Sequence, residues 1–143
     1  MKLIMENFRK FLSEATNIDI DDDSGFGNVF GVAHDDLRNV MNWAQKEGVD
    51  EASVKAVSVL ELPIAILKNI NVEEEARGQG VGGQLMEEFI SAAADQGAFT
   101  IVLIADLGQT QGSGFDLEKW YRDYGFETVG FDGGKNPVMV MVQ

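Results

Sequence analysis

The residues with the clearest chemical potential lie directly after Arg77, where four glycines occupy the six positions from Gly78 to Gly83. A helical apolar pattern begins within this stretch. The first turn of a helix leaves backbone N–H groups without partners and carries the positive end of the helix dipole. Glycines let an anion approach the main chain without meeting Cβ atoms. The pattern predicts a phosphate-binding turn, to which Arg77 would add the one formal charge; a tight turn with glycines for packing alone is the alternative.

Two familiar phosphate motifs do not fit this stretch. Gly78, Gly80 and Gly83 form a literal G-x-G-x-x-G, but five residues separate the apolar strand ending at Val72 from the first glycine. A dinucleotide fold needs that glycine almost directly after the strand, and several further strand–helix units. A P-loop needs a Lys-Ser/Thr pair after the glycines, and none follows. Another anion-binding motif is therefore expected.

Composition removes several kinds of chemistry. The chain has no cysteine, which excludes disulfides, a cysteine zinc site and a cysteine nucleophile. Its single histidine, His34, excludes a multi-histidine metal site, and we expect it at a helix start or on the surface. We therefore predict no metal.

The net charge of −13 argues against nucleic acid as a partner, because phosphate backbones bind to basic surfaces. It fits a cationic amine partner, although solubility alone explains acidity equally well. No apolar run approaches the ~18 residues of a membrane span, and the amino-terminal segment is too charged for a signal peptide. We expect a cytoplasmic protein that does not bind membranes; a homodimer is left open.

The amino-terminal segment, residues 1–15, is predicted to be a short amphipathic helix, because Ile4, Phe8, Phe11 and Leu12 recur at helical spacing. It either packs on its own domain or serves as a docking tag. The residues Leu-Ser-Glu at 12–14 resemble leader cleavage sites of some tailed-phage virion proteins. Residues 16–143 are predicted to form one domain.

The remaining pattern alternates strands and helices, which predicts an α/β sheet. A strand, a solvated acidic turn at Asp21–Asp23 and a second short strand at 28–32 come first; the segment 50–60 is ambiguous between helix and strand. The stretch 98–106 is a buried strand typical of a central, parallel position. The other expected elements are helices at 35–47, 81–95 and 117–124, and strands at 62–72, 127–131 and 137–142.

Two motifs in this order resemble the GNAT superfamily of N-acetyltransferases. The stretch INVEEEARGQGVGGQLMEEF resembles the acyl-coenzyme A signature, with Arg77, Gly80 and Gly82 at its diagnostic positions. The stretch EKWYRDYGFE resembles the later helix of the family, in which Tyr121 lies four residues before Gly125. The resemblance covers about residues 70–126. It implies the acyl-CoA N-acyltransferase fold: a mixed, centrally splayed β-sheet flanked by helices.

The resemblance also implies a cofactor, acetyl-CoA, and the residues that bind it. In the family, the strand before the glycines splays from its parallel neighbour, and the pantetheine arm lies in that gap. The backbone groups of Ile70 and Val72 would bind this arm, and the glycine turn would bind the diphosphate. The implied cofactor-binding set is Ile70, Val72, Arg77, Gly78, Gln79, Gly80, Val81, Gly82 and Gly83.

The implied reaction is direct attack of a primary amine, from a small molecule or a protein, on the bound thioester. Tyr121 suits protonation of the departing thiolate, because a phenol with a pKa of about 10 keeps its proton at neutral pH. Glu73 is the candidate base; solvated charge on a turn is the alternative.

The sequence departs from the family at Gly114, where many members carry an asparagine that contacts the cofactor arm, and the amino-terminal half lacks one of the family's clear hairpins. The alternative function is a catalytically silent acyl-CoA-binding module that the amino-terminal helix tethers to a larger assembly such as a virion.

Overall fold

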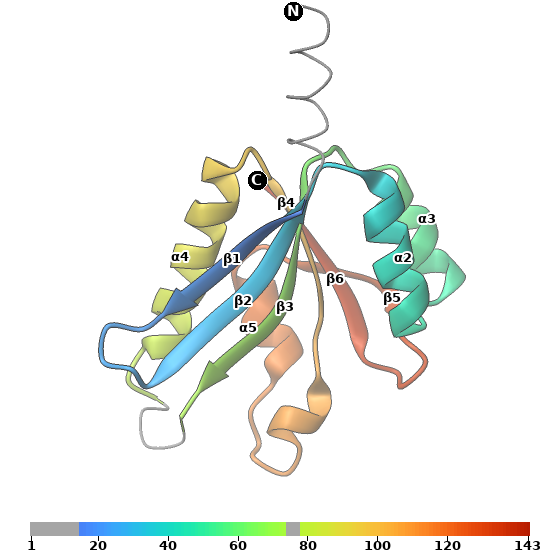
Figure 1. The fold of residues 1–143 in the computed structure, drawn as a ribbon. Helices are drawn as coiled ribbons and strands as arrows, with labels where there is room; N and C mark the ends of the chain where they lie inside the picture. Colours follow the sequence, from blue (N-terminus) through green and yellow to red (C-terminus); the bar gives the residue numbers. More distant parts are fainter. Residues whose placement is uncertain (1–14, 74–77) are drawn as a thin grey trace, which may run out of the picture.

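The computed structural model describes residues 15–73 and 78–143, and its centre is a six-stranded mixed sheet in the order β1-β2-β3-β4-β6-β5 (Figure 1). The predicted amino-terminal helix and Arg77, a predicted cofactor-binding residue, lie outside these residues. The strands are β1 Thr16–Asp21, β2 Gly27–His34, β3 Ile64–Val72, β4 Thr100–Ile104, β5 Glu127–Phe131 and β6 Pro137–Val142. The helices are α2 Leu37–Glu47, α3 Glu51–Ser58, α4 Val81–Asp95, the 3-10 turn η2 Leu107–Thr110 and α5 Leu117–Asp123.

Helices cover the two faces of the sheet and enclose two apolar cores. Helices α4 and α5 pack on one face around Leu85, Phe89 and Leu117, and helices α2 and α3 pack on the other around Val40 and Val57. Strand β3 serves both cores, because its side chains alternate between the faces. The predicted mixed α/β sheet flanked by helices is therefore confirmed.

Two glycines of β2 let α4 lie close to the sheet. A Cβ atom on Gly31 would lie 2.4 Å from the Ile66 carbonyl oxygen and 2.5 Å from the Phe89 ring. A Cβ on Gly27, four residues earlier on the same face, would lie 3.0 Å from Leu85 and 3.1 Å from Val81. These distances are shorter than van der Waals contact, so α4 reaches this position only over glycine.

Strand β3 carries a bulge at Lys68. Its pairing with β2 aligns Leu67 with Gly31 and Asn69 with Phe30, so that Lys68 has no partner of its own in the register. The parallel pairing with β4 runs from Ile64 to Leu67 and ends there, although β3 continues to Val72. A bulge bends its strand and increases the local twist. The bulge therefore coincides with the point at which β3 and β4 separate, and the predicted splay is present.

Most of the element predictions are confirmed, with four revisions. The ambiguous segment is the helix α3, which begins after Asp50. The second strand is β2, which is longer than expected and ends at His34; this histidine is therefore a strand end and not a helix start. Asp22 in the acidic turn is largely buried and accepts a hydrogen bond from the Ser24 backbone, so the turn is not wholly solvated. The loop after β4 contains the turn η2.

Within the described residues, no helix combines the length and apolar character that a membrane crossing requires.

Candidate cofactor and active site

Helix α4 differs from the other described helices at its amino terminus. An aspartate caps each of the others by accepting a hydrogen bond from a backbone N–H group of the first turn; these aspartates are Asp36, Asp50, Asp106 and Asp116. The α4 cap is Gly80, which offers no side-chain acceptor, and no acidic residue lies in the first turn. Within residues 15–73 and 78–143, no side-chain cap accepts from the first backbone donors of α4, and such a helix start suits an external anion.

The turn into α4 has a backbone that favours glycine. Gly78 and Gly80 have φ angles of 83° and 81°, in the left-handed region that disfavours other residues. A Cβ atom on either would have no neighbour within 4 Å. Open space therefore surrounds this part of the turn, and the glycines serve its conformation and not close packing. Gly78, Gln79 and Gly80 are exposed, whereas Val81, Gly82 and Gly83 are partly buried.

Three predicted site elements meet at the start of α4. A Cβ atom on Gly82 would lie 3.6 Å from Val72 Cγ2 at the end of β3 and 3.6 Å from Trp120 Cζ2 on α5. A Cβ on Gly83 would lie 2.8 Å from the Tyr124 hydroxyl, also on α5. The structure therefore brings together the glycine turn, the end of the bulged strand and the helix that carries the predicted acid.

Ile70 and Val72 lie in the part of β3 that extends beyond the pairing with β4. Both side chains are half-buried and pack against the core on the α4 side. Without the bulge, alternation from Leu67 would direct the side chain at position 70 to the opposite face. The bulge thus accounts for two features together, the separation from β4 and the orientation of Ile70 and Val72.

Tyr121 lies on α5 with its side chain only 4% exposed. Its ring packs edge to face against Trp120, with centroids 5.1 Å apart, and against Phe126, with centroids 5.9 Å apart. Burial, with a smaller contribution from the negative charge of Asp106, raises the pKa of Tyr121 to about 12. The hydroxyl therefore keeps its proton throughout the neutral range, as the proposed acid must. Asp106 follows β4, which indicates that Tyr121 lies toward the separated end of the sheet.

Glu73 is exposed at the end of β3, and its backbone N–H donates to the Phe26 carbonyl oxygen at 2.7 Å. It borders a cavity of about 250 Å³ together with Asp21, Asn28 and Asn71. These last three are direct cross-strand partners on β1, β2 and β3. Because Gly27, next to Asn28, faces α4, this row of side chains faces the opposite way. The candidate base therefore borders the face of the sheet away from α4.

Sequence reasoning missed several residues that shape this region. Lys68 could have been found, since the apolar residues Leu67 and Ile70 in LKNINV break the alternation of a regular strand. The contribution of Asp106 to the pKa of Tyr121 had no sequence signal, because 15 positions separate them. Asn28 and Asn71 form one row only through strand pairing. Gly114, the departure from the family pattern, is exposed with a φ angle of 78°.

Comparison with known proteins agrees with this geometry. The sequence profile of the acetyltransferase (GNAT) domain matches residues 27–128, from β2 into β5. An acetyltransferase from Bacillus cereus superposes with a TM-score of 0.56 at 16% identity, covering 99% of this chain and 86% of that one. The PaiA N-acetyltransferase from Thermoplasma acidophilum, solved in complex with coenzyme A, gives 0.55 at 15% identity, covering 99% and 70%. A GNAT family acetyltransferase from Elizabethkingia anophelis with acetyl-CoA bound gives 0.51 at 16% identity, covering 96% and 82%.

No curated protein matched the sequence. Structural similarity at these identities establishes the fold, and the profile covers well over half of the chain. The protein therefore belongs to the GNAT acetyltransferase family, a class of acyltransferases, and the assignment made from the two sequence motifs is confirmed.

Proposed function

We propose that this protein is an N-acetyltransferase that transfers the acetyl group of acetyl-CoA to a primary amine. One observation carries the proposal furthest: helix α4, whose cap Gly80 has no side chain, begins in contact with the bulged strand that separates from β4. The helix start suits a diphosphate and the separated strand suits an extended arm. Structural neighbours solved with coenzyme A or acetyl-CoA support the choice of ligand.

The cofactor is assigned to residues on both sides of the contact between the start of α4 and the end of β3. Backbone N–H groups from Gly78 to Gly83 would bind the diphosphate, which an acidic protein can do without a lysine cluster because the donors are main-chain groups. Arg77, outside the described residues, stays a prediction for the countercharge. The backbone of Ile70 and Val72 would bind the pantetheine arm, because these residues extend beyond the last pair with β4.

Bound acetyl-CoA would supply an activated acetyl thioester. With no cysteine in the chain, no enzyme thiol can carry the acetyl group, and direct transfer to the amine is the natural route. The amine nitrogen forms the new bond to the acetyl carbon, and the carbon–sulfur bond breaks. A cationic amine loses two protons, one before the attack and one as the amide forms, and a base accepts them and releases them to solvent. Tyr121 gives one proton to the sulfur and regains one from solvent, so that one proton is released overall. The buried, protonated hydroxyl of Tyr121 supports this assignment.

The acceptor is assigned to the face of the sheet away from α4. The cavity there is bordered by two carboxylates, Asp21 and Glu73, and two amides, Asn28 and Asn71. Such a lining favours a cationic amine, and Glu73 could take its proton directly or through water. The negative charge of the whole chain favours the same kind of acceptor.

A silent acyl-CoA-binding module is the second candidate, and Gly114 is the feature that favours it. This position carries an asparagine that contacts the cofactor arm in many family members, whereas glycine offers no side chain. Binding could then persist through α4 while the reaction fails.

A thiol-release assay separates the two functions. Because the chain has no cysteine, a thiol reagent reports released coenzyme A without a background from the protein. The enzyme proposal expects release that depends on one of a panel of cationic amines, with mass spectrometry showing the acetylated amine. Tight acetyl-CoA binding without amine-dependent release across small amines and lysine peptides would support the silent module instead.

A further inference from the structure

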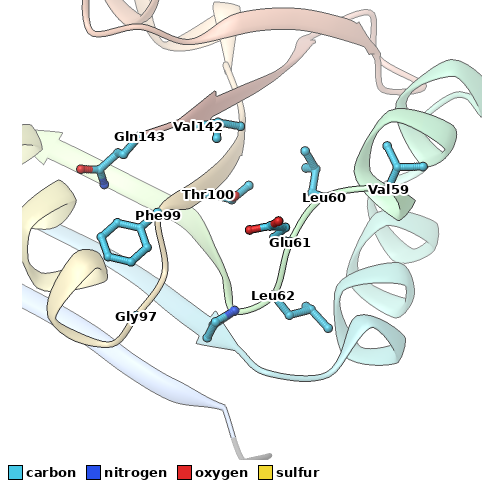
Figure 2. A pocket seen from close by; sticks show the side chains of 10 residues that line it. Val59, Leu60, Glu61, Leu62, Gly97, Phe99, Thr100, Val142 and Gln143 are labelled. Carbon is cyan, nitrogen blue, oxygen red and sulfur yellow. The ribbon is translucent and has the colours of Figure 1, made fainter.

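One end of the sheet carries an apolar surface that neither core uses. This is the end where β3 and β4 begin and β6 finishes, opposite to the separated end. A cavity of about 420 Å³ opens there between the α3–β3 connection, the α4–β4 connection and the carboxyl terminus. Figure 2 shows the side chains that border it.

The side chains around this cavity are unusually exposed for their type. Val59 is 81% exposed, Leu62 40%, Phe99 54% and Val142 66%. They are four of the eight large apolar side chains found exposed in the described part of the chain. Half of these eight exposed side chains therefore border one cavity. A contiguous group of exposed apolar side chains marks a surface that another segment covers.

We propose that residues 1–14 of the same chain cover this apolar end. The described chain begins at Ala15, directly before β1, and Thr16 pairs with Ala33, whose neighbour His34 pairs with Ile64 at the start of β3. Ile64 pairs in turn with Thr100, which borders the cavity. The segment is thus tethered at the same end of the sheet as the surface.

The length of residues 1–14, taken as a helix, matches the distance from β1 to β3 and β4. Neighbouring strands lie about 4.8 Å apart, so β3 is about 10 Å and β4 about 14 Å from β1. In the helix predicted from the sequence, a rise of about 1.5 Å per residue would set Phe8 about 9 Å and Ile4 about 15 Å from Glu14. A helix that crosses the strand ends would therefore bring these two apolar side chains level with β3 and β4.

The charge of residues 1–14 also favours this segment as the occupant of the cavity. The segment contains three basic residues, Lys2, Arg9 and Lys10, and two acidic ones, whereas the whole chain has 11 basic and 24 acidic residues. The Glu61 side chain points into the cavity (Figure 2), and no ion pair of it occurs among the described residues. A segment with apolar and basic side chains complements an apolar cavity that contains a carboxylate.

Paramagnetic labelling of the full-length chain tests this proposal. Because there is no native cysteine, Lys10→Cys gives a single site for a nitroxide on the polar side of the predicted helix. In a ¹⁵N-labelled sample, the amide signals of Val59, Phe99, Thr100 and Val142 should lose most of their intensity relative to the reduced sample. Signals of β5, at the far edge of the sheet, should keep theirs.

Two controls make each result decisive. Adding Phe8→Asp to the labelled chain should restore the signals, because a carboxylate cannot occupy an apolar cavity without cost; unchanged broadening would show that apolar docking is not the cause. In a mixture of nitroxide-carrying ¹⁴N chains with unlabelled ¹⁵N chains, the same signals should stay sharp. Loss of these signals in the mixture as well would assign the surface to a second copy and overturn the proposal. Sharp signals at the cavity in every sample would overturn the proposal.

Discussion

At the scale of single residues, Tyr121 has the most specific assigned role. Its hydroxyl is the group that would protonate the departing sulfur, while its ring is part of the core between Trp120 and Phe126. Tyr121→Phe removes the hydroxyl and keeps the ring. Turnover should fall about tenfold or more, in line with the worth of a general acid, while coenzyme A affinity and the melting temperature stay close to wild type. Steady-state kinetics, calorimetry and a thermal scan measure these three quantities; unchanged turnover would remove Tyr121 from the mechanism.

The raised pKa of Tyr121 has a consequence for stability at high pH. The folded state binds this proton more tightly than the unfolded chain, in which the pKa is near the ordinary value of 10. The resulting stabilisation, about 2 to 3 kcal/mol, is complete below pH 10 and is lost as the pH rises through about 12. Urea unfolding from about pH 9 to pH 11 should show a smaller loss of stability for Tyr121→Phe than for wild type. Parallel curves for the two proteins would show that the hydroxyl is not desolvated.

Residue types alone predicted the glycine turn, but not the geometry of each glycine. Gly80 was expected to leave room for a phosphate, and its left-handed φ angle and open surroundings agree with that role. Gly83 lies instead against the Tyr124 hydroxyl, so its absence of a side chain serves the contact between α4 and α5. A sequence motif cannot distinguish these two uses, because both require only that a Cβ atom be absent.

At the scale of elements, the bulge in β3 is the feature that opens the sheet. Lys68 is the extra residue, and the pairing with β4 ends beside it. Deleting Lys68 should straighten β3 and extend its pairing with β4, because a regular strand continues its ladder. Coenzyme A affinity should then be lost, while the far-ultraviolet circular dichroism spectrum stays that of a folded α/β protein.

Lys68→Ala is the matched control for the deletion. It removes the exposed side chain and keeps the number of residues, so the bulge and the coenzyme A affinity should persist. Equal loss of binding in both variants would attribute binding to the lysine charge and not to the bulge. Calorimetric titration with coenzyme A measures both proteins.

The elements were largely predictable because each carries a local signal. The apolar period of α4 and the buried run of β4 depend on neighbours within a few residues, and both were found. Helix α3 was ambiguous because Val54, Val57 and Val59 fit a strand as readily as a helix; the Asp50 cap settles it, by accepting from the Ser53 N–H at 2.9 Å. The row of Asp21, Asn28 and Asn71 depends on the pairing of three strands, which no local pattern encodes.

At the scale of the whole molecule, charge should govern the choice of acceptor. The net charge of −13 creates a field that attracts cations, and salt screens it as the Debye length falls from about 30 Å in 0.01 M salt to about 3 Å in 1 M. For a cationic amine, the Michaelis constant should rise steadily across this range. It should change little for an aromatic amine that is neutral at the assay pH. Equal salt dependence for the two amines would contradict the proposed cationic acceptor.

The proposed function depends on whether the main-chain donors at the start of α4 bind the diphosphate of coenzyme A. Gly80→Asp and Gly80→Asn test this most directly, because both side chains tolerate a left-handed φ angle, have nearly the same shape and differ in charge. The space around Gly80 accepts either, so both variants should fold, which a thermal scan checks.

Isothermal titration with coenzyme A is the deciding measurement. Wild type and Gly80→Asn should bind, whereas Gly80→Asp should bind at least about tenfold more weakly than Gly80→Asn, because its carboxylate would repel the diphosphate and accept from the same N–H groups. Equal affinity of the two folded variants would show that the diphosphate does not bind at the start of α4.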